Sequence, residues 1–137
     1  MLNLAKKKIM IQKTGKRKKA IARAVAKSGS GEIIINNKPL EIFEPETLKL
    51  FIKEPLMIAG ERVKDIDISV DVKGGGVFGQ ASAARQAIAK ILVEHEKGLK
   101  EKFLSYDRTL LVADARRTEV HKPGPSDARH HKQRSKR

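Results

Sequence analysis

The residues best placed to do chemistry form a glycine-rich loop, KGGGVFG, at residues 73–79. Glycine lets backbone N–H groups approach a phosphate closely, and a helix that begins after the loop adds a partial positive charge. A nucleotide-hydrolysing P-loop needs lysine and then serine or threonine after its last glycine, whereas Gln80 and Ala81 follow here. The dinucleotide-binding glycine spacing is absent too. Two interpretations stay open, an RNA phosphate contact or a turn that lets a helix pack closely, and nucleotide chemistry is disfavoured.

Acidic and histidine side chains provide no convincing metal or catalytic site. Asp65, Asp67 and Asp71 share one face of a strand, where carboxylates can bind a metal ion, but a solvated face accounts for them as well. The three histidines near the C-terminus lack the scaffold that a metal site needs. There is no cysteine nucleophile and no plausible acid–base pair. We therefore predict a protein that is not an enzyme and has no metal, cofactor or small-molecule substrate.

Charge is segregated along the 137 residues, whose formal net charge is +14. Residues 1–31 hold ten basic residues and no acidic one, and residues 116–137 hold eight basic and two acidic residues. The segment between them holds twelve basic and fourteen acidic residues and is close to neutral. Two basic arms around a near-neutral globule indicate a polyanionic partner, and nucleic acid fits best. A membrane fits less well because the arms lack an apolar face that would insert.

This composition predicts that the chain divides into two parts. Residues 1–115 are predicted to form a globular domain that carries the basic N-terminal arm. Residues 116–137 contain too few large apolar side chains for a core and are predicted to form an extended basic tail. With four phenylalanines and one tyrosine, the chain shows no recognisable stacking platform or major-groove helix. Recognition of nucleic acid by shape and backbone is therefore expected.

Hydrophobic periodicity predicts the elements that position these residues. Residues 17–27 alternate between four alanines on one face and basic or apolar residues on the other, so a helix could pack closely on the alanine face. Three isoleucines at 33–35 follow a Ser-Gly turn, which predicts a hairpin over residues 17–36. The other expected elements are a helix that starts near Pro45, is ended or kinked by Pro55 and has a cap at Gly60, a strand at 65–73, helices at 79–95 and 99–104, and a last strand at 108–113. This order predicts an α+β fold with one four-stranded sheet and helices on one face.

Three ordered motifs resemble the small-subunit ribosomal protein nine family. They are TGKRKKAIARA (14–24), VKGGG (72–76) with GQA (79–81), and a tail with KPG (122–124) and SKR (135–137). The resemblance covers residues 9–137, and residues 109–120 are more similar to the archaeal and eukaryotic branch than to the bacterial one. We expect an archaeal-type member. The tail departs from the family at Asp127 and at His130–His131.

The resemblance implies a fold and partners that periodicity alone does not give. The fold would be an α/β sandwich with a left-handed βαβ crossover, as in the ribonuclease P protein and a domain of translocase elongation factors. The protein would be cytoplasmic and ribosomal, bound to rRNA in the head of the small subunit and to neighbouring proteins there. The tail would thread through rRNA to the anticodon stem-loop of the P-site tRNA. Ser135, Lys136 and Arg137 would then be the tRNA-contacting residues.

The expected rRNA contacts combine a basic patch, which is residues 16–19 with Arg23, the glycine loop and the basic tail. An RNA-processing protein of the same fold, a histone-like DNA compactor and a small nucleotide-using enzyme are the alternatives. The residues expected to contact rRNA are Lys16, Arg17, Lys18, Lys19, Arg23, Lys73, Gly74, Gly75, Gly76, Gln80, Arg85, Arg116, Arg117, Lys122, Arg129, Lys132 and Arg134.

Overall fold

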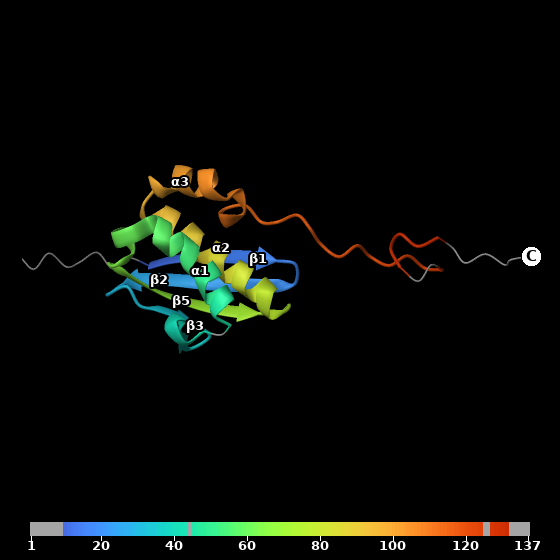
Figure 1. Ribbon diagram of the computed structural model, residues 1–137, viewed down its shortest axis with the longest axis horizontal. Coiled ribbons are helices and arrows are strands. Elements are labelled where there is room, and N and C mark those ends of the chain that lie inside the picture. Colours follow the sequence, from blue (N-terminus) through green and yellow to red (C-terminus); the bar gives the residue numbers. More distant parts are fainter. Residues whose placement is uncertain (1–9, 44, 125–126, 132–137) are drawn as a thin grey trace, which may run out of the picture.

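The computed structural model describes residues 10–43, 45–124 and 127–131. A mixed five-stranded sheet has three α-helices packed against it, and an extended segment leaves one end of the globule (Figure 1). The predicted α+β class is therefore confirmed. The elements are β1 (Met10–Arg17), β2 (Ala20–Ser28), β3 (Ile33–Ile35), β4 (Lys38–Pro39), α1 (Glu46–Ala59), β5 (Ile66–Lys73), α2 (Val77–His95) and α3 (Leu99–Tyr106), with short 3₁₀ helices at Leu40–Ile42, Gly60–Val63 and Arg108–Leu110.

The strand order β1-β2-β5-β3-β4 corrects the expected topology. The sheet has five strands and not four, because β1 and β4 were not anticipated, and residues 108–110 form a 3₁₀ helix in place of the expected last strand. The hairpin that exists joins β1 to β2, and β2 does not pair with β3. Strand β5 lies between β2 and β3, antiparallel to β2 and parallel to β3. The chain from β3 through α1 to β5 is thus a βαβ crossover, and its left-handedness stays a prediction.

Hydrogen bonds to Asp67 explain why β3 does not fold back on β2. The Asp67 Oδ1 atom accepts from the backbone N–H groups of Ser30, Gly31 and Glu32 at 2.8, 2.9 and 2.9 Å. The N–H donors, with that of Glu32 foremost, lower the pKa of the Asp67 carboxyl group. They hold the loop after β2 across the start of β5, so the chain continues on the far side of β5.

Helix α2 packs on the small-residue face that the sequence predicted. Ala20, Ala22, Ala24 and Ala26 of β2 are fully buried. On β1 a Cβ atom at Gly15 would overlap the carbonyl of Ala83 in α2, which shows how closely the two backbones approach. Without bulky side chains in between, the helix axis comes near the sheet and the interior fills at ordinary packing density.

Two side chains of α2 also close the free edge of β1. Gln86 Oε1 accepts from the Lys16 backbone N–H at 2.8 Å, and Lys90 Nζ donates to the Thr14 carbonyl at 2.9 Å. Burial lowers the pKa of Lys90, and the charges of Lys13 and Lys16 lower it further. These bonds leave fewer edge groups open to pairing with another strand.

Helix α1 begins after Pro45 and is capped by Gly60, both as expected. Pro55 does not end this helix, which continues to Ala59. Proline at 55 is buried, so packing against the core compensates for the hydrogen bond that it cannot make. Within the described residues, no helix is long and apolar enough to cross a membrane.

Replacing Gly15 by alanine tests the close approach of α2 to β1. The added methyl group overlaps the Ala83 carbonyl, so we expect the free energy of unfolding to fall by about 3 kcal/mol, the upper end of the usual cost of overpacking. Urea denaturation measures the change. Gly76→Ala is the matched control, because a Cβ atom there meets nothing within 4 Å. Equal unfolding midpoints for Gly15→Ala and the unsubstituted protein would contradict the packing described.

Candidate nucleic-acid interface

The turn between β1 and β2 presents two lysines at one end of the sheet. Lys18 and Lys19 are the only residues between Arg17 and Ala20, which pair as the last register position of the hairpin. Both lysines are exposed. Lys18 has φ = +53°, a left-handed conformation for which this turn position normally uses glycine. A lysine that carries this backbone cost is favoured where the side chain has a role of its own.

The glycine loop between β5 and α2 lies directly against this turn. Gly74 and Gly75 have φ of +80° and +65°. A Cβ atom at Gly74 would come within 2.6 Å of the Lys19 carbonyl oxygen, so only glycine allows the two backbones to approach this closely. Gln80 stabilises the loop by donating from Nε2 to the Gly74 carbonyl at 3.1 Å. The structure therefore joins the basic patch and the glycine loop, which are about fifty residues apart in sequence.

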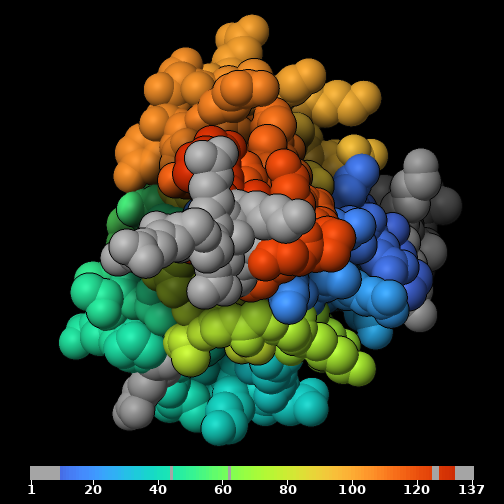
Figure 2. Space-filling view, turned by 90° about the vertical axis from the view of Figure 1, so that its right-hand side faces the viewer, coloured from blue at the N-terminus to red at the C-terminus, as the bar shows by residue number. Residues whose placement is uncertain are grey.

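A cavity of about 480 Å³ lies where the turn and the loop meet. Its wall includes three basic residues and no acidic one, and Thr118 of the C-terminal segment contributes to it. Figure 2 shows this end of the molecule, where the blue hairpin and the yellow-green loop lie beside the orange-red C-terminal segment. The lining residues are Arg17, Lys18, Lys19, Gly75, Gly76, Val77, Phe78, Gly79 and Thr118.

The open face of the sheet continues the basic surface. Arg23 of β2 and Lys73 of β5 are exposed, and they line a second cavity of about 360 Å³ together with Lys19 and Asp71. Asp71 lies opposite Arg23 in the strand register. One carboxylate therefore accompanies three cations on this part of the surface.

Arg17 connects the globule to the start of the tail. Its guanidinium forms an ion pair with Asp114, which also binds Arg116 through Nη2 and Oδ2 at 2.7 Å. The Arg116 bonds, and then the charge of Arg17, hold the pKa of Asp114 well below its usual range. The Arg17 side chain is only 14% exposed, whereas that of Arg116 is 77% exposed. Arg17 thus anchors the tail, and Arg116 stays accessible.

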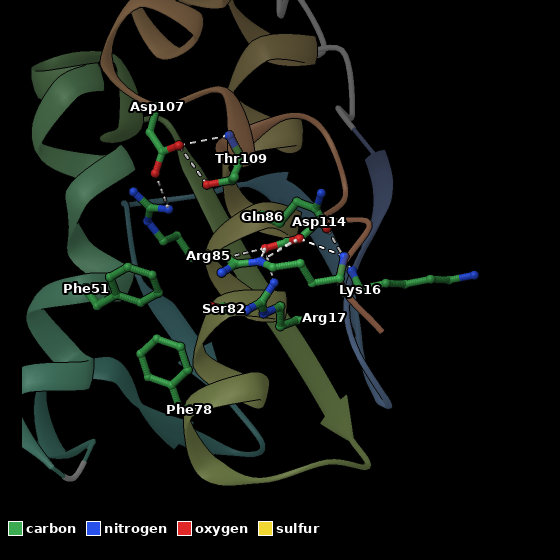
Figure 3. A pocket seen from close by; sticks show the side chains of 11 residues that line it. Lys16, Arg17, Phe51, Phe78, Ser82, Arg85, Gln86, Asp107, Thr109 and Asp114 are labelled. Carbon is green, nitrogen blue, oxygen red and sulfur yellow. Dashed lines mark hydrogen bonds and ion pairs between the residues drawn. The ribbon is translucent and has the colours of Figure 1, made fainter. Parts of the chain in front are cut away.

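Arg85 was expected to contact RNA, but the structure places it inside the globule. It is 4% exposed and sits on α2 beneath the surface. Its guanidinium pairs with Glu54 at 2.5 Å and Asp107 at 3.3 Å, and it lies 4.4 Å from the centre of the Phe51 ring (Figure 3). These partners give Arg85 an internal role that links α1, α2 and the segment after α3.

The described part of the tail presents several cations to solvent. Arg117, Lys122 and Arg129 are exposed, although Arg129 also binds Glu119 within the tail, with Nη2 and Oε1 2.5 Å apart. The basic residues Lys132 and Arg134 and the expected tRNA-contacting residues Ser135, Lys136 and Arg137 lie outside the described residues.

The acidic strand face does not form a metal site in the described part of the chain. The Asp67 carboxylate accepts hydrogen bonds from three backbone N–H groups, and Asp71 lies opposite Arg23 in the strand register. No group of three or more metal-binding side chains occurs among the residues that the structure describes.

Comparison with known proteins agrees with the arrangement of the motifs. A family model described as ribosomal protein S9/S16 matches residues 15–137. The chain belongs to the ribosomal protein S9/S16 family. One relative, the small ribosomal subunit protein uS9 of Methanococcus maripaludis strain C5, is 57% identical over 119 residues, which are 85% of this chain and 89% of the relative. The uS9 protein of Methanococcus vannielii is 56% identical over the same shares. These S9/S16 relatives confirm the family that the sequence predicted, and both come from archaea of one genus.

One feature of this S9/S16 domain was missed from the sequence. Val77 and Phe78 follow the glycine loop and are 56% and 59% exposed, and the Phe78 ring stacks on Phe51 of α1 with centroids 5.7 Å apart. Two apolar residues directly after three glycines were a visible signal, but their partner lies on another helix and cannot be found by spacing.

Proposed function

We propose that the protein is a structural, non-enzymatic component of the small ribosomal subunit, where it binds rRNA. Its relatives are described as small ribosomal subunit proteins. The observation that carries the proposal is the surface made by the β1–β2 turn and the glycine loop, because Lys18 and Lys19 line it and no acidic residue does, while Arg17 is paired with Asp114. Such a surface fits the phosphate backbone of a folded RNA.

Two kinds of donor meet on this surface. Lys18 and Lys19 bring ammonium groups that bind phosphate as mobile point charges. The first N–H groups of α2 have no partner within the helix, and the N-cap residue Gly76 offers no side chain to cap them. A phosphate placed between the turn and the helix start would accept hydrogen bonds from both.

Further cations extend the surface in two directions. Lys16, Arg23 and Lys73 continue it over the open face of the sheet, and Arg116, Arg117, Lys122 and Arg129 continue it along the tail. Arg17 and Arg85 contribute indirectly, since the first anchors the tail and the second holds the helices together. This division suits recognition of rRNA shape more than of base sequence.

We also propose that the tail reaches P-site tRNA in the assembled particle, with rRNA of the head and neighbouring proteins as its surroundings. Fifteen residues follow from Pro123 to Arg137, and a fully extended chain of that length spans roughly 50 Å. Lys136 and Arg137 would bind phosphates of the anticodon stem-loop as charge clamps, with Ser135 beside them.

Replacing Lys18 and Lys19 by alanine tests the rRNA surface. Each lost phosphate contact removes about 0.7–0.9 from the slope of log affinity against log salt, so the double variant should lower the slope by about 1.5 and bind more weakly. Filter binding to a transcript of the small-subunit head rRNA measures both. Lys97→Ala with Lys102→Ala removes the same charge from exposed sites elsewhere and serves as control. Equal slopes for the two double variants would contradict the proposal, and equal wild-type affinity for duplex DNA would favour a DNA compactor.

Deleting Lys136 and Arg137 tests the tail separately. We expect small subunits that contain the shortened protein to assemble normally and to bind P-site tRNA more weakly, because two charge-assisted contacts are lost. Binding of labelled tRNA to purified subunits measures the effect. Unchanged tRNA affinity would contradict the proposed contact of Lys136 and Arg137 with tRNA.

A further inference from the structure

We propose that an unpaired RNA base stacks on Phe78, beside the phosphate-binding surface. The inference rests on the proposed RNA-binding function and names the part of the RNA that the cavity takes. It also revises the sequence-based expectation that the domain has no stacking platform.

The first observation is a column of flat groups that ends at the surface. The Arg85 guanidinium, the Phe51 ring and the Phe78 ring follow one another in Figure 3, with 4.4 Å from the guanidinium carbon to the Phe51 centroid and 5.7 Å between the ring centroids. The two rings are 23° from parallel. One face of Phe78 lies on Phe51 and 59% of the residue is still exposed, so the ring offers accessible surface that Phe51 does not cover.

The column is held in place from below. Arg85 is fixed by Glu54 of α1 and by Asp107 after α3, and in turn it supports the inner ring, Phe51. Phe78 therefore has one side packed against a ring that is itself held in place. An aromatic ring that is already ordered loses little conformational entropy when a ligand covers its second face.

The second observation is the chemistry around the open ring. Phe78 and Val77 line the same cavity as Arg17, Lys18 and Lys19, and no acidic residue lines it. Phe78 also borders a smaller cavity with Asp107 and Asp114, whose carboxylates pair with Arg85 and with Arg17 and Arg116. The cavity of about 480 Å³ is large enough for a nucleobase. An apolar platform bordered by cations matches a nucleotide, whose base has a π face and whose phosphate is an anion. A protein partner would need acidic side chains to match the same border.

The test uses the full chain and two RNA probes of one length. One is a single-stranded oligoadenylate that carries a central 2-aminopurine, and the other is the same strand paired with oligouridylate. Phe78→Ala and Phe78→Leu remove the π face, and Phe78→Tyr keeps it. Tyr106→Ala removes an aromatic residue of similar exposure, 57%, that lines neither this cavity nor the one beside Arg23. Circular dichroism confirms that each variant is folded, and leucine maintains apolar contact with Phe51.

Stacking predicts about tenfold weaker binding of the single strand by Phe78→Ala and Phe78→Leu, loss of 2-aminopurine quenching, and little change with the duplex, whose bases stay paired. Phe78→Tyr and Tyr106→Ala should bind as the unsubstituted protein does. Binding of the single strand by Phe78→Leu at full strength, with quenching intact, would overturn the proposal. So would a defect confined to occupancy of the ribosomal subunit with oligonucleotide binding unchanged, because that result indicates a protein contact. Replacing Lys18 and Lys19 should weaken both probes, which separates failure of stacking from failure of RNA binding.

Discussion

Helix α2 approaches β1 and β2 closely because Gly15 of β1 and four alanines of β2 lie beneath it. The glycine loop that precedes the helix lies directly against the β1–β2 turn. Gln86 and Lys90 of the same helix close the edge of β1. A larger side chain below α2 would move the helix outward and separate the loop from the turn. The basic surface is therefore a consequence of small residues in the core.

One ion pair connects the start of the tail to the sheet. Arg17 ends β1, and its bond to Asp114 fixes the point at which the chain leaves the globule. The β1–β2 turn and the start of the tail therefore lie at the same end of the sheet, as Figure 1 and Figure 2 show. One end of the molecule presents both, so a single RNA surface can engage the two together.

Hydrophobic periodicity predicted the strands and helices that depend on residues near one another in the sequence. The alternation of β5 and the alanine face of β2 gave both strands, and helical spacing gave α2. The β2–β3 hairpin was wrong because Asp67, about thirty-five residues away, binds the loop and sends β3 to the other side of β5. For the site, the run of basic residues pointed to Lys18 and Lys19, and the glycines pointed to the loop. The same expectation included Arg85, whose burial no sequence pattern reveals. The Phe51–Phe78 pair joins two helices and could be seen only in three dimensions.

The β1–β2 turn and the glycine loop form the surface that we propose binds rRNA. Acetylation of lysines in purified native small subunits, compared with the free protein, tests this role, because contact with phosphate shields an amine from reagent. We predict that Lys18, Lys19 and Lys73 are protected in the subunit, while the exposed Lys97 and Lys102 react as in the free protein. Equal reactivity of Lys18 and Lys19 in the free protein and in the subunit would contradict it.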